Sequence, residues 1–115
     1  MIAVDTSALM AIALDEPLAK ACQAALAAED DILISAGTLA EVLIVSARRR
    51  VGARMAAVLN RFDLNIVSVT QAMARRVGEA YEQWGRGMHP ASLNCGDCFA
   101  LCAGERAGLP APLCR

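Results

Sequence analysis

The sequence predicts one α/β domain spanning residues 1–115, with a central parallel sheet flanked by helices. Short apolar runs rich in β-forming residues alternate along the chain with longer segments at helical spacing, the pattern typical of a parallel sheet. A chain of 115 residues is long enough to bury a core without disulfides or structural metals. Its composition, 57% hydrophobic but only 3% aromatic, suits closely packed helices and excludes a disordered chain.

The first half of the chain contains two predicted strands, each followed by helices. An apolar run ends in an acid at Asp5, which indicates a buried strand carrying a carboxylate at its C-terminal end. Pro17 fits the first turn of a helix that starts near Asp15. The predicted elements are a strand over 2–5, a helix capped by Thr6 or Ser7 and running to Ala13, a helix from Asp15 that ends at the acids 29–31, a strand over 32–35, and a helix opened by Gly37 and Thr38 that ends at Arg48 to Arg50.

The second half continues the alternation and ends in an interrupted strand. Thr70 is a suitable N-cap for a long helix that carries Met73, Val77 and Trp84 at helical spacing. The predicted elements are a helix over 53–61, a strand over 65–69, the helix after Thr70, a loop over 85–93, a helix from Asn94 to about Gly104, and a final strand within 109–115. Pro110 and Pro112 oppose that last strand, so we expect the C-terminal strand to be missing or altered.

The charge and hydropathy of the chain exclude a membrane span. No apolar run reaches the roughly 18 residues that a spanning helix needs, and the N-terminus lacks the features of a signal peptide. We therefore expect a cytoplasmic protein. The net charge of −1 predicts no partner by itself.

Arginine residues are concentrated in one stretch of the chain. Every basic residue except Lys20 is arginine, and a cluster is formed by Arg48, Arg49, Arg50, Arg54 and Arg61. Arginine suits bidentate phosphate contact, so the stretch is a candidate RNA-binding surface. A solvated helix face is the alternative interpretation.

Three acids are placed where a metal site could form. Asp5 ends the first strand, Glu41 is expected in the first turn of the helix after the second strand, and Asp97 in the first turn of the helix after the loop. In a parallel sheet all three would lie at the C-terminal side, where carboxylates that cluster need a cation among them. Oxygen ligands of this kind suit Mg²⁺ or Mn²⁺, which activate water and stabilise charge on a phosphate under in-line attack.

The same acids have structural explanations. Thr38 and Glu41 fit a capping box at the start of a helix, and Asn94 and Asp97 fit the same device. Asp5 is harder to explain in this way, because an acid that ends a buried strand is seldom structural. The two roles are compatible, because a capping contact also fixes the carboxylate.

Three segments together resemble the PIN-domain nucleases, and in particular the VapC-type toxins of bacterial toxin–antitoxin pairs. The segments are Ile2-Ala3-Val4-Asp5-Thr6-Ser7-Ala8, Ser35-Ala36-Gly37-Thr38-Leu39-Ala40-Glu41 and Leu93-Asn94-Cys95-Gly96-Asp97-Cys98. Their order and spacing are similar to those of the family from Met1 to about Gly108. His89-Pro90, just before the third segment, is typical of the VapC branch.

The resemblance implies a PIN-like α/β fold and a metal-dependent endoribonuclease using Mg²⁺ or Mn²⁺. It implies an RNA substrate, a cognate antitoxin and commonly a homodimer. It assigns Asp5, Glu41 and Asp97 as catalytic and metal-binding acids. It also assigns Thr6 or Ser7 as a supporting hydroxyl, and Asn94 as a polar neighbour of the third acid.

One motif of the family has no counterpart here. PIN domains usually carry a fourth acid after a final strand, whereas no acid follows Glu105. A truncated or frameshifted tail would produce this difference. An alternative function is therefore a weakened PIN module that binds an antitoxin without cutting RNA.

The cysteines and the single histidine offer further candidate sites. Cys95, Cys98 and Cys102 form a C-x₂-C-x₃-C run, which hints at a zinc or iron–sulfur site. The same spacing places them on one helical face, as core packing requires. His89 could shuttle protons, although an ordinary loop residue is the interpretation we favour.

Overall fold

The computed structural model describes residues 1–85, 87, 95–106 and 113–114. Its four strands form one sheet in the order β3-β2-β1-β4, and every neighbouring pair is parallel. The strands are β1 (Ile2–Val4), β2 (Ile32–Ser35), β3 (Leu64–Val67) and β4 (Leu113–Cys114). The predicted α/β fold with a central parallel sheet is confirmed.

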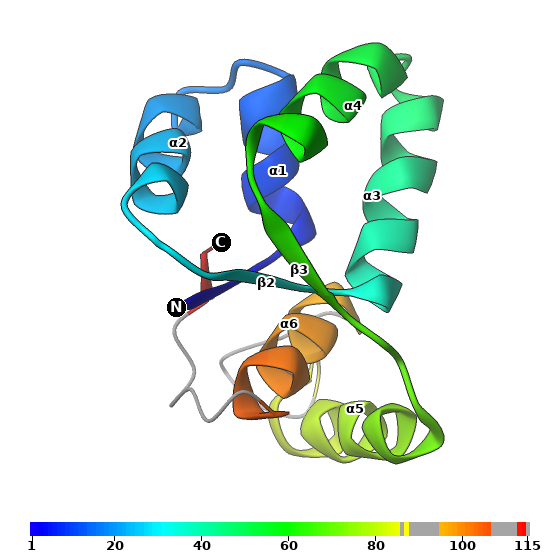
Figure 1. Ribbon diagram of the computed structural model, residues 1–115. Coiled ribbons are helices and arrows are strands. Elements are labelled where there is room, and N and C mark those ends of the chain that lie inside the picture. Colours follow the sequence, from blue (N-terminus) through cyan, green and yellow to red (C-terminus); the bar gives the residue numbers. More distant parts are fainter. Residues whose placement is uncertain (86, 88–94, 107–112, 115) are drawn as a thin grey trace.

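Helices cover both faces of the sheet. They are α1 (Thr6–Ala13), α2 (Ala19–Ala27), α3 (Ala36–Arg48), α4 (Gly52–Arg61), α5 (Gln71–Trp84) and α6 (Cys95–Arg106). Figure 1 shows α1 to α4 on one side of the sheet, and α5 and α6 on the other. The result is a three-layer α/β/α sandwich with β1 and β2 in the middle of the sheet.

Each face of the sheet has its own hydrophobic core. The larger core joins the sheet to the first four helices, and Leu9, Leu26, Ile34 and Met55 are among its fully buried side chains. The smaller core lies between α5 and α6 and contains Met73, Val77, Cys98, Cys102 and Ala103. Because β2 is buried on both faces, its residues are mostly apolar in succession and do not alternate between apolar and polar.

The edge strands differ from the prediction. The third strand was expected over 65–69, but it begins at Leu64 and ends at Val67. The last strand falls within 109–115 and is altered, as one of the two expectations had it: it has two residues, Leu113 and Cys114, which pair in parallel with Ala3 and Val4. Pro110 and Pro112 both precede Leu113 in the sequence, so neither interrupts the hydrogen bonding of this short strand.

The start of α2 was predicted too early. Asp15 adopts a left-handed conformation with φ of 53°, and the Glu16 N–H donates to the Ala11 carbonyl oxygen. These features close α1, because a left-handed residue is a common helix terminator and Asp tolerates it. The helix after Pro17 begins only at Ala19.

The caps of α1 and α3 also differ from the prediction. Asp5 itself is the N-cap of α1, in place of Thr6 or Ser7. Ser35 is the N-cap of α3, so Thr38 lies inside the first turn and the capping box with Glu41 does not form. In both cases the polar residue at the junction of strand and helix supplies the cap, and the helix begins without an intervening loop.

Thr70 caps α5 as predicted, and its loss should be measurable. Its Oγ1 accepts a hydrogen bond from the Met73 N–H at 3.1 Å. We expect Thr70→Ala to lower the free energy of unfolding by about 1 kcal/mol, because the N–H loses its acceptor. Urea unfolding measures the change. Thr70→Asn, which keeps a capping oxygen, should stay close to the wild type.

Among the described residues, no helix is both long enough and apolar enough to cross a bilayer.

Candidate acidic site

Asp5 lies at the point where β1 ends and α1 begins, and it is only 3% exposed. One carboxylate oxygen, Oδ1, accepts the Thr6 N–H at 2.7 Å. The other, Oδ2, accepts the Ser7 hydroxyl at 3.3 Å. The carboxylate is therefore held in a defined orientation at the C-terminal end of the sheet, the end at which open α/β folds bind ligands.

The starts of α1 and α3 lie side by side. In the parallel register, Ile2 pairs with Ile32 and Ala3 with Leu33, so Asp5 comes beside Ser35 two residues later. The fully buried Ser35 hydroxyl accepts the Gly37 N–H at 3.1 Å. Two helix N-termini therefore meet at this edge, and both favour negative charge nearby.

Two contacts establish how α3 is oriented between its neighbours. The Ser46 hydroxyl lies 3.5 Å from the Met10 sulfur, so one face of α3 packs on α1. On another face, a Cβ added to Gly37 would lie 2.8 Å from the Phe99 ring of α6. The first half of α3 therefore stands between α1 and α6.

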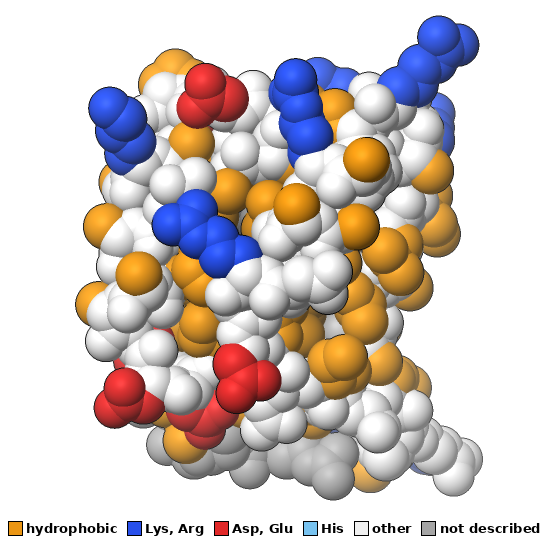
Figure 2. Space-filling view, turned by 45° about the horizontal axis from the view of Figure 1, so that its top comes forward, with side chains coloured by type: hydrophobic (Ala, Val, Ile, Leu, Met, Phe, Trp, Pro, Cys, Tyr) orange, Lys and Arg blue, Asp and Glu red, His pale blue; other side chains and the backbone are white. Residues whose placement is uncertain are grey.

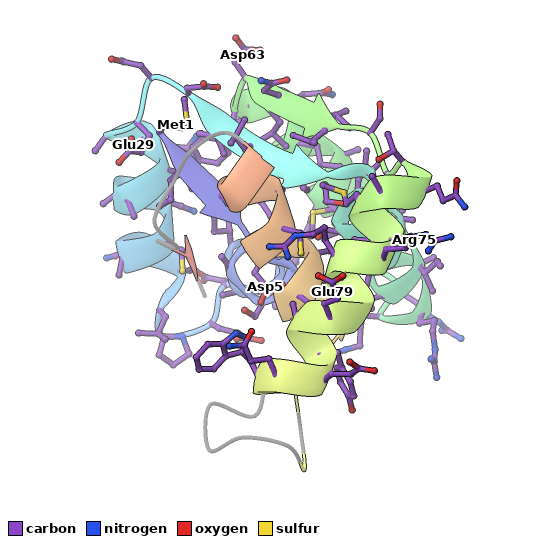
Figure 3. The ribbon with its side chains drawn as sticks, turned by 90° about the horizontal axis from the view of Figure 1, so that it is seen from below. Met1, Asp5, Glu29, Asp63, Arg75 and Glu79 are labelled. Atoms are coloured by element: carbon purple, nitrogen blue, oxygen red, sulfur yellow. The ribbon has the colours of Figure 1, made fainter. Side chains whose placement is uncertain are left out.

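Glu41 and Asp97 are carried to this same region. Glu41 lies one helical turn beyond Gly37, on the side of α3 that borders both α1 and α6, and it is partly buried. It belongs to the second turn of α3, one turn later than predicted. Asp97 lies in the first turn of α6, two residues before Phe99. Figure 3 shows Asp5 beside α6 when the molecule is seen from below.

The structure describes only part of the proposed acidic cluster. It describes the side chains of Asp5 and Glu41, whereas the Asp97 side chain and all of Asn94 and His89 lie outside the described residues. Among the described side chains, no group of three His, Cys, Asp or Glu could hold a metal ion. The third acid of the proposed cluster is Asp97, whose backbone lies in the first turn of α6.

The donor set suits a hard divalent cation. Asp5 offers carboxylate oxygens, which are the ligands that Mg²⁺ and Mn²⁺ prefer. Thr6 is buried next to Asp5, and its Oγ1 has no hydrogen-bond partner among the described residues. A buried hydroxyl without a partner is expected where a water molecule or ligand completes a site. Ser7 is exposed, and its hydroxyl serves Asp5 directly.

The arginine cluster lies at the opposite end of the molecule. Arg48 is twelve residues beyond Ala36 on α3, a rise of about 18 Å away from the acidic site. Arg50 adopts φ of 57° in the turn that ends the helix. Figure 2 shows basic side chains on this part of the surface as separate groups among apolar ones.

Arg54 and Arg61 line a pocket of about 410 Å³ near the C-terminal end of α1. Asp15 and Gln23 complete its polar lining. The pocket is therefore at the far end of α1 from Asp5. In the layer that contains α6, the basic side chains that the structure describes are Arg75 and Arg76 on α5, which the sequence did not single out.

Two of the three cysteines of α6 lie in the core. Cys98 and Cys102 are at most 4% exposed and pack with Met73 and Val77 of α5. The shared helical face therefore serves packing, which is the structural alternative to a metal–thiolate site. The side chain of Cys95 is outside the described residues.

Comparison with known proteins identifies the family. The family model named PIN domain matches residues 2–111. The chain is 36% identical over 110 residues to "VapC ribonuclease Mb0640" of Mycobacterium bovis, covering 93% of this chain and 84% of that protein. It is 34% identical over 110 residues to "Ribonuclease VapC" of Mycolicibacterium smegmatis, covering 93% and 85%.

A solved structure supports the fold independently. The crystal structure of VapC20 from Mycobacterium tuberculosis, described as a "Sarcin-Ricin loop cleaving toxin", matches with a TM-score of 0.73 at 18% identity. The match covers 95% of this chain and 85% of that one. By sequence and by fold, the chain therefore belongs to the PIN-domain family, within its VapC group.

Proposed function

We propose that this protein is an endoribonuclease toxin that cleaves phosphodiester bonds of cellular RNA with the help of Mg²⁺ or Mn²⁺. The observation that carries the proposal is Asp5, a buried carboxylate at the C-terminal end of the central strand. The VapC relatives, which are named ribonucleases, support the reaction class.

Each candidate residue would have a role that its position allows. Asp5 and Asp97 would hold a divalent ion, which activates water and stabilises the charge on the phosphate. Glu41, on the side of α3 that borders α1 and α6, would orient the attacking water or hold a second ion. Ser7 fixes the Asp5 carboxylate by donating to Oδ2. Thr6 and Asn94 would support the acids from the same helix starts.

Removal of divalent metal should abolish cleavage. We expect the purified protein to cut RNA from a total cellular pool in the presence of Mn²⁺, and to lose this activity in excess EDTA. The reason is that carboxylates alone cannot stabilise the charge that develops on the phosphate. Gel analysis of the RNA measures the effect, and full activity in EDTA would contradict the proposal.

The binding-only alternative makes a different prediction. Under it the chain is a weakened PIN module that binds an antitoxin without cutting RNA. For such a module, isothermal titration would show tight binding of the antitoxin but no measurable uptake of Mn²⁺. Uptake of Mn²⁺ together with RNA cleavage would eliminate the alternative.

The proposed partners are the RNA substrate and a cognate antitoxin that covers the acidic site, both in the cytoplasm. A homodimer is also proposed. Leu43 and Ile44 of α3 are 52% and 60% exposed, and Ile66 of β3 is 53% exposed. These side chains could supply an apolar contact between two copies. Val42, on the same helix, is fully buried and cannot contribute.

The distance of the arginine cluster from Asp5 limits which RNA molecules could contact both. Arg48, Arg49, Arg50 and Arg54 are all exposed but lie far from Asp5. They would engage phosphates only of an RNA long enough to reach both ends of α3. A short oligonucleotide centred on the cleavage site would therefore be cut equally well by an Arg48→Ala/Arg49→Ala variant.

A further inference from the structure

One face of α3 is a buried stripe that contains two hydroxyls. Thr38, Val42 and Ser46 are spaced four residues apart and are at most 1% exposed. The Ser46 hydroxyl donates to the Val42 carbonyl oxygen at 2.6 Å and lies near the Met10 sulfur of α1. Because the three residues share a face, Thr38 is directed to α1 as well, two turns closer to the sheet.

The Thr38 hydroxyl differs from the Ser46 hydroxyl in having no partner. Thr38 is fully buried, and its Oγ1 makes no hydrogen bond within the described part of the chain. Ser46 bonds back to a carbonyl oxygen of the preceding turn, whereas Thr38 stands in the first turn of α3 and has no preceding helical turn to bond to. An unpaired buried hydroxyl is costly, and it calls for a water molecule or a ligand.

The location of Thr38 indicates what that water or ligand serves. Thr38 lies in the first turn of α3, three residues before Glu41, and this turn starts beside Asp5. The other buried hydroxyl without a partner in the described chain is that of Thr6, in the adjacent first turn of α1. Both unpaired hydroxyls therefore border the acidic site.

We propose that Thr38 is a positioning residue of the acidic site. Its hydroxyl holds a water molecule that hydrogen-bonds to the Asp5 and Glu41 carboxylates when a divalent cation is bound. Without the cation, no described residue pairs with the hydroxyl. This role rests on the metal-dependent function proposed above, and it adds a residue that neither caps a helix nor touches the RNA.

The test uses thermal unfolding of the whole chain with and without Mn²⁺. Thr38→Val keeps the shape and removes the hydroxyl. Without metal, its Tm should rise by about 2 °C or more, because an unpaired polar group is removed. The Mn²⁺ concentration needed for half of the metal-induced Tm increase should rise about tenfold, the usual cost of losing a hydrogen-bonding group around a metal site.

Two further variants separate positioning from packing. Thr38→Ser retains the hydroxyl and should restore the wild-type response to Mn²⁺ within about threefold, as expected if the hydroxyl and not the methyl group acts. Ser46→Ala removes a paired hydroxyl from the same stripe. It should lower the Tm and leave the Mn²⁺ response unchanged.

The possible results are distinguishable. A lower metal-free Tm for Thr38→Val, including failure to fold, would show that the hydroxyl already has a partner and would overturn the proposal. An unchanged Mn²⁺ response in Thr38→Val would also overturn it, while leaving the metal-dependent function intact. If the wild type itself showed no Mn²⁺ response, both the metal-dependent function and the role of Thr38 would be refuted.

Discussion

Asp5→Asn should abolish RNA cleavage while leaving the fold intact. Asparagine is as good an N-cap as aspartate, so its side-chain oxygen can still accept the Thr6 N–H. The amide has no negative charge to hold a divalent cation. A metal ion supplies several kcal/mol of transition-state stabilisation, and each 1.36 kcal/mol is tenfold in rate, so we expect a loss of about 100-fold or more.

Measuring the stability of Asp5→Asn beside its activity separates loss of the charge from loss of the fold. Loss of the charge at a helix N-terminus should change the free energy of unfolding by no more than about 1 kcal/mol. Asp63→Asn is a suitable control, because Asp63 is exposed and lies far from Asp5 in Figure 3. We expect this control to cleave RNA at the wild-type rate. Wild-type activity in Asp5→Asn would contradict the assigned role.

The sequence predicted the strands better than the helix starts, for a physical reason. Residues 32–35 were predicted with the observed bounds because a short run rich in β-forming residues follows the acids 29–31. Asp5 and Ser35 were assigned to strands, and both proved to be caps as well. A strand that passes directly into a helix leaves no loop residues to mark the boundary, so pattern alone places the cap too late.

The acidic site was partly predictable in the same way. The topology of a parallel sheet was enough to place Asp5 and the segments of Glu41 and Asp97 at one edge. The buried Thr38 hydroxyl was missed because Thr38 was interpreted as a cap, and only burial shows that it lies in the interior. The sequence alone also could not show that the arginine cluster lies far from this edge. That distance follows from the length of α3, which separates the two.

Gly37 presents the second large expected effect, because α6 packs directly on it. A Cβ at this position would lie 2.8 to 3.0 Å from three atoms of the Phe99 ring, which is closer than carbon atoms tolerate. We expect Gly37→Ala to lower the free energy of unfolding by about 1–3 kcal/mol, as overpacking of a well-filled contact does. The Tm should fall by about 5 °C or more.

A second glycine provides the matched control. Gly78 lies inside α5 with no atom within 4 Å of an added Cβ. Gly78→Ala should raise the stability by about 0.5–1 kcal/mol, because alanine favours the helix. Opposite signs at the two positions would attribute the loss in Gly37→Ala to the contact with α6. A loss of equal size in both variants would contradict this explanation.

Gly37→Ala should also weaken cleavage more than its stability loss explains. Phe99 is two residues from Asp97 on α6, so a displaced ring moves the helix start that carries the third acid. A displacement of this kind can cost about 100-fold in rate when reacting groups must be held in register. In a Phe99→Leu background the same glycine change should cost less in both stability and activity, because the smaller side chain can give way. If the two substitutions proved additive, the contact between α3 and α6 would not be what positions Asp97.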